Sequence, residues 1–190
     1  MSDINYIIFD LDGTLIDSYA TVVSAYKRVF EEHAPEAMPD NAFFERYRDK
    51  DLEQMFRLLA EMAQLSNEGF RAFYDQQYEL ESTQGTTIIK EAYETLRTAK
   101  GDGMGVIVIT NKHQIIAEKV CKMLFAHDEI DIIIGRRDGI PIKPRHVIKD
   151  RLKMYGINPE KDCLKYYGDS ESDRKTAELL NVKFINTKNK

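Results

Sequence analysis

The apolar residues between about residue 17 and residue 85 recur with the period of an α-helix. Val22, Tyr26 and Val29 fall on one face of a single helix, and residues 14–84 hold one glycine, Gly69, and two prolines. A stripe of apolar residues at helical spacing over residues 52–63 predicts a second helix. Two more helices are expected where a capping residue precedes apolar positions: Asp40 before Phe44 and Tyr47, and Ser66 before Phe70, Phe73 and Tyr74. The pattern therefore predicts an all-helical segment.

The remainder of the chain alternates short apolar runs with helical patterns. The apolar runs cover residues 4–9, 106–109, 130–134, 164–167 and 182–185, and the helical patterns cover residues 91–100, 113–124, 144–155 and 171–180. Near-continuous apolar strands that alternate with helices are typical of a parallel sheet covered on both faces. The sequence thus predicts an α/β core from residues 1–16 and 86–190, interrupted after its first strand by a helical insert, residues 17–85.

Polar residues follow the predicted strands where each strand ends. These residues are Asp10 and Asp12 after the first strand, Thr110, Asn111 and Lys112 after the second, Lys143 in the loop after the third, and Asp169 and Asp173 after the fourth. Ligands of open α/β sheets bind at the carboxyl ends of the strands. Several carboxylates at one edge repel each other unless a cation lies among them, and oxygen ligands favour Mg²⁺. A lysine and a helix N-terminus add a preference for an anion, so the combination suits a phosphoryl group.

Composition and charge narrow the class of partner. The 190 residues include 27 Lys and Arg against 32 Asp and Glu, a net charge of −5, which argues against nucleic-acid binding. No apolar run approaches the length of about 20 residues that a membrane helix needs, and Met1–Asn5 lacks the basic head of a signal sequence. The two cysteines, Cys121 and Cys163, have no metal-ligand spacing. A cytoplasmic protein is expected.

Four motifs in chain order resemble the signatures of the haloacid dehalogenase-like (HAD) hydrolase superfamily. Residues 9–15 (FDLDGTL) resemble the first signature, residues 108–112 (VITNK) the second, Lys143 with Pro144 the third, and residues 168–173 (GDSESD) the fourth. The strings DGTLIDS and TNK are most similar to phosphoglycolate phosphatase-like members. The resemblance implies a Rossmann-like three-layer core with about five parallel strands and a helical cap of the C1 type.

The resemblance also implies a role for each motif residue. Asp10 would be the nucleophile that forms an aspartyl-phosphate, and Asp12 would be the general acid and base. The implied catalytic residues are Asp10, Asp12, Thr110 and Lys143; the phosphate-binding residues are Gly13, Thr110, Asn111 and Lys143; and the residues at the Mg²⁺ site are Asp10, Asp12 (through its backbone carbonyl), Asp169 and Asp173. The implied activity is a Mg²⁺-dependent phosphatase that hydrolyses a small phosphorylated metabolite.

Several alternatives stay open from the sequence. A β-phosphoglucomutase-like phosphomutase uses the same motifs, and a non-catalytic binding protein on the same scaffold is a further possibility. Locally, Lys143 is either a phosphate ligand or a solvated loop lysine, and Asp173 is either part of the site or an acid that complements the helix dipole. The basic residues Arg46, Arg48 and Lys50 lie in an acidic insert and are candidates for binding a second anionic group of the substrate. The expected partner is a small phosphate ester, without nucleic acid or membrane, and the expected state is a monomer or weak homodimer.

Overall fold

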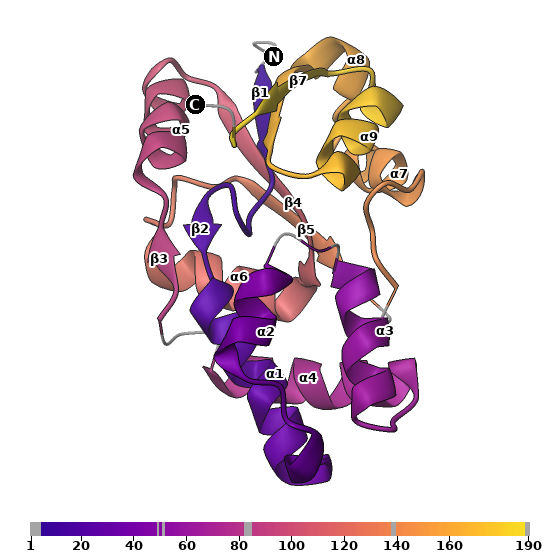
Figure 1. The fold of residues 1–190 in the computed structure, drawn as a ribbon. Coiled ribbons are helices and arrows are strands. Elements are labelled where there is room, and N and C mark those ends of the chain that lie inside the picture. The colour runs from indigo at the N-terminus through magenta and orange to yellow at the C-terminus, as the bar shows by residue number, and fades with distance from the viewer. Residues whose placement is uncertain (1–4, 49, 51, 82–84, 138–139, 189–190) are drawn as a thin grey trace. The chain divides into compact units, whose positions relative to one another are not determined.

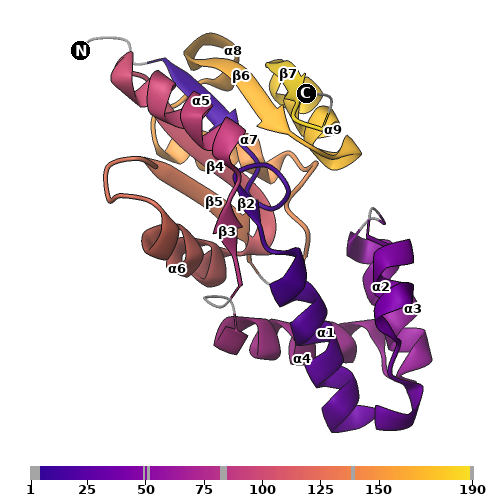
Figure 2. The same cartoon turned by 60° about the vertical axis from the view of Figure 1, so that its left-hand side comes forward.

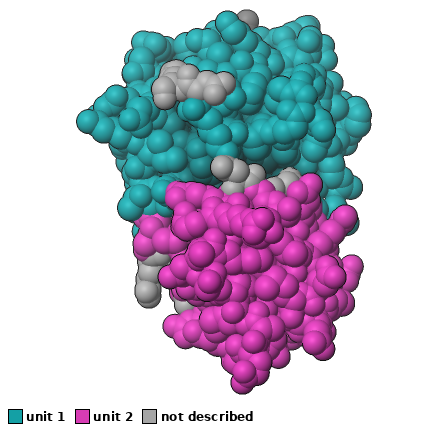
Figure 3. Space-filling view, viewed as in Figure 1, with its two compact units in different colours: residues 1–17, 87–190 teal, residues 18–86 magenta. Residues whose placement is uncertain are grey.

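The computed structural model describes residues 5–48, 50, 52–81, 85–137 and 140–188. Contacts divide the chain into two compact units (Figure 3). The first, here called the core unit, joins residues 1–17 to residues 87–190, and the second, the helical unit, spans residues 18–86. Within the described ranges, no helix combines the length and the apolar character that crossing a membrane requires.

The core unit is built on a parallel five-stranded sheet with the strand order β5-β4-β1-β6-β7 (Figure 1). The strands are β1 (Tyr6–Phe9), β4 (Gly105–His113), β5 (Ile132–Arg136), β6 (Cys163–Gly168) and β7 (Lys183–Asn186). Four of them match the predicted apolar runs within two residues at either end; β4 continues four residues further. Ile4, where the first run begins, lies outside the described residues. The predicted α/β class with a parallel sheet is confirmed.

Helices cover both faces of this sheet (Figures 1 and 2). They are α5 (Lys90–Gly101), α6 (Gln114–Leu124), α7 (Val147–Met154), the short α8 (Pro159–Asp162) and α9 (Glu171–Leu180). Alternate residues of the strands point to opposite faces, so Ile8, Ile107 and Tyr166 join α7 and α9 in one buried cluster. Helices α5 and α6 pack against β4 on the other side. Burial on both faces explains why the strands read as continuous apolar runs.

Two short elements of the core unit were not expected from the sequence. Strands β2 (Ile16–Asp17) and β3 (Thr87–Ile88) form an antiparallel pair of their own. Helix α8 is a single turn that begins at Pro159, where the side chain of Asn158 accepts a hydrogen bond from the amide of Glu160. Elements of two to four residues are too short to show a period, and pairing between distant segments determines the β2–β3 sheet.

The helical unit contains α1 (Tyr19–His33), the 3₁₀ turn η1 (Pro35–Ala37), α2 (Asn41–Arg46), α3 (Leu52–Met62) and α4 (Asn67–Glu81). Helix α4 packs against both α1 and α3. The expected N-caps are present: Asp40 accepts a hydrogen bond from the amide of Phe43 at 2.8 Å, and Ser66 accepts one from the amide of Gly69 at 3.0 Å. The prediction of a helical segment inserted after the first strand is confirmed.

The centre of the helical unit is aromatic and also contains a buried ion pair. Tyr26 lies against Phe44, Phe56, Phe70 and Tyr74, with ring centroids between 4.8 and 6.2 Å apart. The Arg71 guanidinium stacks 4.2 Å from the centre of the Phe56 ring, and its Nη2 donates to both carboxylate oxygens of Glu53 at 2.6 and 2.7 Å. The Arg71 side chain is 9% exposed. One cation thus faces one carboxylate in this core.

Candidate active site

The sheet order brings three of the sequence motifs together. Strand β1 lies between β4 and β6, and all three run in parallel, so their carboxyl ends meet at one edge. Asp10 continues β1, and its amide donates to the carbonyl of Tyr167 on β6 at 2.8 Å. The ladder between β4 and β5 is irregular between Ile109 and His113, so the residues that follow Ile109 leave the regular pairing. The motif residues therefore surround the end of the central strand.

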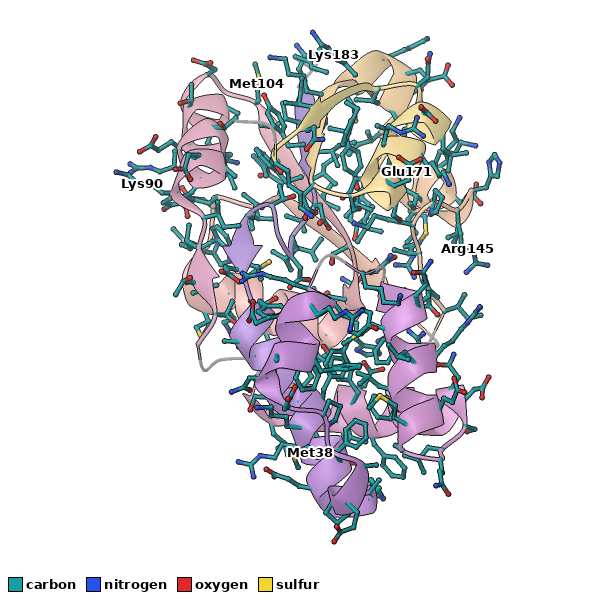
Figure 4. All side chains as sticks on the ribbon, viewed as in Figure 1. Met38, Lys90, Met104, Arg145, Glu171 and Lys183 are labelled. Atoms are coloured by element: carbon teal, nitrogen blue, oxygen red, sulfur yellow. The ribbon has the colours of Figure 1, made fainter. Side chains whose placement is uncertain are left out.

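Lys143 is the centre of this arrangement. Its Nζ lies 2.6 Å from Oδ1 of Asp10 and 2.6 Å from Oδ1 of Asp173. The lysine side chain is 4% exposed, and both carboxylates are buried. The solvated alternative for Lys143 is therefore wrong: Arg145, two residues further on, has that character and points away from the core unit (Figure 4). One buried ammonium bridges two buried carboxylates.

The second motif holds the loop that carries Lys143. The Asn111 side chain accepts hydrogen bonds from the amides of Ile142 and Lys143, both at 2.9 Å. Arg136 is buried, and its Nε donates to the carbonyl of Asn111 at 3.1 Å. The side chain of Asn111 thus fixes the loop that carries Lys143.

Asp173 is held from several sides at the start of α9. Its Oδ2 accepts from the amide and the hydroxyl of Ser170 at 3.1 and 2.5 Å, and the Ser170 hydroxyl accepts from the amide of Asp173 in a capping box. The Tyr166 hydroxyl donates to Oδ1 at 3.2 Å. Burial raises the pKa of Asp173, but Lys143 and Ser170 lower it by more, so it lies below the usual range. Asp173 thus lies in the first turn of α9, where an acid complements the helix dipole, and it also contacts Lys143 of the candidate site.

Asp10 is held less favourably than Asp173. Burial raises its pKa well above the usual range, and the charges of Asp173 and Asp169 act in the same direction. Lys143 opposes this shift but does not cancel it. The carboxylates around Asp10 thus outnumber the lysine that neutralises them, and the ionised Asp10 needs further positive charge.

Asp169 completes the acidic group beside the turn that follows β1. Gly13 has φ +79°, and a Cβ atom placed there would lie 2.5 Å from Oδ2 of Asp169, so a larger residue would displace this carboxylate. Burial raises the pKa of Asp169, and Lys188, whose Nζ lies 3.4 Å from Oδ2, opposes the shift. Gly168 has a similar constraint, because a Cβ atom there would lie 2.4 Å from Cβ of Asp173. These glycines allow the acidic side chains to approach β1.

The carboxylates fit a hard divalent cation. Asp10, Asp169 and Asp173 each offer an oxygen within 4.8 Å of the others. All three are oxygen donors, the kind that Mg²⁺ prefers, and the raised pKa of Asp10 and of Asp169 shows that added positive charge would stabilise their ionised forms. Because Lys143, Tyr166 and Ser170 already engage both oxygens of Asp173, Asp10 and Asp169 are the better candidates for direct ligands.

Two predicted site residues, Asp12 and Thr110, contact Lys112. Asp12 lies 2.8 Å from Nζ of Lys112 through its Oδ1, a pair that the sequence did not predict. The hydroxyl of Thr110 is buried and accepts the amide of Lys112 at 3.1 Å. The sequence pointed to Lys112 as part of the second motif, but gave no signal for the direction of its side chain. It likewise gave no signal for Tyr166 or Lys188.

Comparison with known proteins identifies the family of this chain. The family model described as haloacid dehalogenase-like hydrolase matches residues 7–187, so the chain belongs to that family. The phosphoglycolate phosphatase of Aquifex aeolicus is 26% identical over 183 residues, which are 93% of this chain and 81% of that protein. The pyrophosphatase PpaX of Halalkalibacterium halodurans is 25% identical over 176 residues, 90% of this chain and 77% of that protein.

Solved structures share the fold. A haloacid dehalogenase-like family protein from Streptococcus pneumoniae superimposes with a TM-score of 0.70 at 23% identity, covering 98% of this chain and 85% of that chain. The predicted superfamily and its hydrolase class are confirmed. The resemblance to phosphoglycolate phosphatase-like members is confirmed by the relatives.

Proposed function

We propose that the protein is a Mg²⁺-dependent phosphatase that hydrolyses a small phosphorylated metabolite through an aspartyl-phosphate on Asp10. The observation that carries the proposal is the buried Lys143 between Asp10 and Asp173, with Asp169 within 4.8 Å of both carboxylates. A site that combines surplus carboxylates with a buried ammonium suits both a cation and a phosphoryl group. Family membership and phosphatase relatives support the same activity.

The first chemical step uses Asp10 and Asp12. A carboxylate oxygen of Asp10 attacks phosphorus, the bond from phosphorus to the leaving oxygen breaks, and Asp12 gives its proton to that oxygen. Lys143 holds Asp10 in place and neutralises part of its charge as the phosphoryl group transfers. When bound, the divalent cation screens the carboxylates and the phosphoryl oxygens from each other. Thr110 and the backbone near Gly13 and Asn111 are the proposed donors to the phosphate.

The second step returns the enzyme to its starting state. Asp12, now ionised, takes a proton from water while the water oxygen attacks phosphorus. The bond between phosphorus and Asp10 breaks, and inorganic phosphate leaves. Asp173 keeps Lys143 in position through both steps, because it binds the same ammonium that contacts Asp10.

We assign the chemistry to the core, predicted as residues 1–16 and 86–190, and substrate selection to the helical insert, residues 17–85. Within the helical unit a pocket is lined by aromatic and apolar side chains together with Arg48 and Lys50. The Arg48 guanidinium lies 4.3 Å from the centre of the Tyr19 ring. Cations beside an apolar pocket favour a small anionic substrate, and the relatives are named for phosphoglycolate and pyrophosphate hydrolysis. We expect a cytoplasmic monomer or weak homodimer that binds neither nucleic acid nor membrane.

A substrate panel tests the proposal. The protein is incubated with Mg²⁺ and phosphoglycolate, sugar phosphates, nucleoside monophosphates and pyrophosphate, and both released phosphate and isomerised sugar phosphate are measured. We expect free phosphate from at least one compound and none from the Asp10→Asn variant. Isomer without free phosphate would instead identify a phosphomutase, and full activity in Asp10→Asn would refute the nucleophile assignment.

A further inference from the structure

Asp12 has a lysine partner of its own. The Nζ of Lys112 lies 2.8 Å from Oδ1 of Asp12, and the Lys112 side chain is only 7% exposed, while that of Asp12 is 34% exposed. A lysine withdrawn this far from water needs a partner that accepts its hydrogen bond, because an unpaired buried ammonium is costly. The contact therefore belongs to the interior of the candidate active site and differs from a surface ion pair.

The backbone on each side fixes the two partners. The amide of Lys112 donates to the Thr110 hydroxyl at 3.1 Å, which holds the irregular end of β4. On the other side, the amide of Gly13 donates to the carbonyl of Ile16 at 2.8 Å and closes the turn that follows Asp12. With both main chains held, the ion pair selects one orientation of the Asp12 carboxyl group.

The lysines of the site serve different carboxylates. Lys143 bridges Asp10 and Asp173, and Lys112 contacts Asp12. Lys188, which is half-exposed, lies at the longer distance of 3.4 Å from Asp169. The lysine at Asp12 is thus buried like the lysine at the nucleophile, although Asp12 itself is more accessible. This is the arrangement expected of a carboxyl group that must stay oriented while it exchanges protons with substrate and water.

We propose that Lys112 is a positioning residue that orients Asp12 for proton transfer, an inference that rests on the function proposed above. Lys112 engages Oδ1, and proton exchange is assigned to the other carboxyl oxygen, Oδ2. That oxygen gives its proton to the leaving oxygen as the bond to phosphorus breaks, and it takes one proton from water in the second step. Misplacement of a catalytic group by about 1 Å can cost about 10²-fold in rate.

The dependence of the rate on the leaving group distinguishes a positioning role for Lys112 from direct phosphate binding and from a purely structural role. 4-Nitrophenolate is a weak base and leaves without a proton, whereas an alkoxide needs one, so a misplaced general acid harms alkyl phosphates selectively. A lysine that bound the phosphate directly would affect both kinds of substrate equally. A lysine that supported only the fold would lower stability, again without regard to the leaving group.

The experiment compares 4-nitrophenyl phosphate with the alkyl phosphate that the wild type hydrolyses fastest. In Lys112→Met we expect the second-order rate constant for phosphorylation of Asp10, measured in single turnover, to fall about 10²-fold with the alkyl phosphate. With the nitrophenyl ester the same rate constant should fall less than about fivefold. Lys112→Arg should recover the alkyl activity to within about tenfold of the wild type, because it restores a cation. In an Asp12→Asn background, Lys112→Met should cost less than about twofold.

Controls keep the result decisive. Lys122→Met, at an exposed position of α6, should leave both activities unchanged, and Lys112→Gln replaces Lys112→Met if the latter does not fold. Equal losses with both substrates, or an undiminished loss in the Asp12→Asn background, would overturn the positioning role alone. A wild type that releases phosphate from neither substrate would refute the proposed function, and this inference with it.

Discussion

Each unit of the molecule buries a cation beside carboxylates, but the two groups differ in their balance of charge. In the helical unit, Arg71 faces one carboxylate, Glu53, and stacks on an aromatic ring. In the core unit, Lys143 faces Asp10 and Asp173, and Asp169 lies close by. The first group is neutral as it stands, whereas the second carries an excess of negative charge.

The difference indicates which buried charges serve the fold and which serve function. An arginine that contacts both oxygens of one carboxylate and stacks on an aromatic ring is balanced in charge, so its removal should affect stability. A surplus of carboxylates raises the pKa of Asp10 and leaves a need for positive charge that a metal ion fills. Buried charge alone is therefore a weak sign of a site, and unbalanced buried charge is a stronger one.

Removal of divalent cations should have the largest effect. Chelation should reduce turnover to background and addition of Mg²⁺ should restore it, because the unbalanced group lies in the core unit. Mg²⁺ at about 100 times its Kd should also raise the free energy of unfolding of the wild type by about 3 kcal/mol, and with it the Tm. The shift should be lost in Asp169→Asn and kept in Asp128→Asn, an exposed control. An equal Mg²⁺ shift in all three proteins would contradict the assignment.

Lys143→Met should have the next largest effect on activity. Loss of the ammonium that faces Asp10 should lower kcat/KM by about 10²–10³-fold, the cost of removing one preorganised donor. Steady-state kinetics with released phosphate as readout measure the change. Arg145→Met, two residues away at the surface, is the matched control and should retain activity. Wild-type kinetics in Lys143→Met would contradict the assignment of the core unit's buried charges to catalysis.

Arg71→Met should affect stability and leave catalysis intact. The change leaves Glu53 without its arginine beside the aromatic core, at a cost of about 2–3 kcal/mol, below the range for fully buried pairs because Glu53 is 33% exposed. Urea unfolding gives the loss, and kcat of the folded variant should stay within about twofold of the wild type. The exposed Arg57→Met is the control. A large loss of kcat with unchanged stability would mean that the helical unit's pair is itself part of the site.

The smallest expected effect is a pH-dependent difference in stability. Because the pKa of Asp10 is higher in the folded chain than in the unfolded chain, ionised Asp10 lowers stability as pH rises above about 4, the ordinary Asp value. In chelator, Asp10→Asn should therefore have a higher Tm than the wild type at neutral pH, and the difference should shrink toward acidic pH. A difference that does not change with pH, or a less stable Asp10→Asn, would contradict the raised pKa.

The sequence predicted those parts of the structure that local chemistry determines. Periodicity predicted the helices and the parallel strands, and Asp40 and Ser66 were predicted as caps because a cap contacts residues three positions away. The pair of Arg71 with Glu53, 18 residues apart, depends on how two helices pack, which no period encodes. The same holds for the β2–β3 sheet.

For the site, the sequence predicted which residues meet but not how they contact each other. Strand order explains why Asp10, Lys143, Asp169 and Asp173 converge. The direction of a side chain beyond the strand end depends on tertiary neighbours, and for that reason the contact between Lys112 and Asp12 was not predicted. That the Asn111 side chain holds the Lys143 loop was not predicted, for the same reason.

The central claim is that Asp10 becomes phosphorylated during turnover. Enzyme is mixed with Mg²⁺ and its best substrate, quenched in acid, reduced with borohydride and digested, and residue 10 is examined by mass spectrometry. Borohydride converts an aspartyl-phosphate to homoserine, so the account predicts homoserine at position 10 in samples quenched during turnover and unmodified Asp10 in samples without substrate. Phosphate release with Asp10 unmodified throughout, or with the modification at another carboxylate, would contradict it.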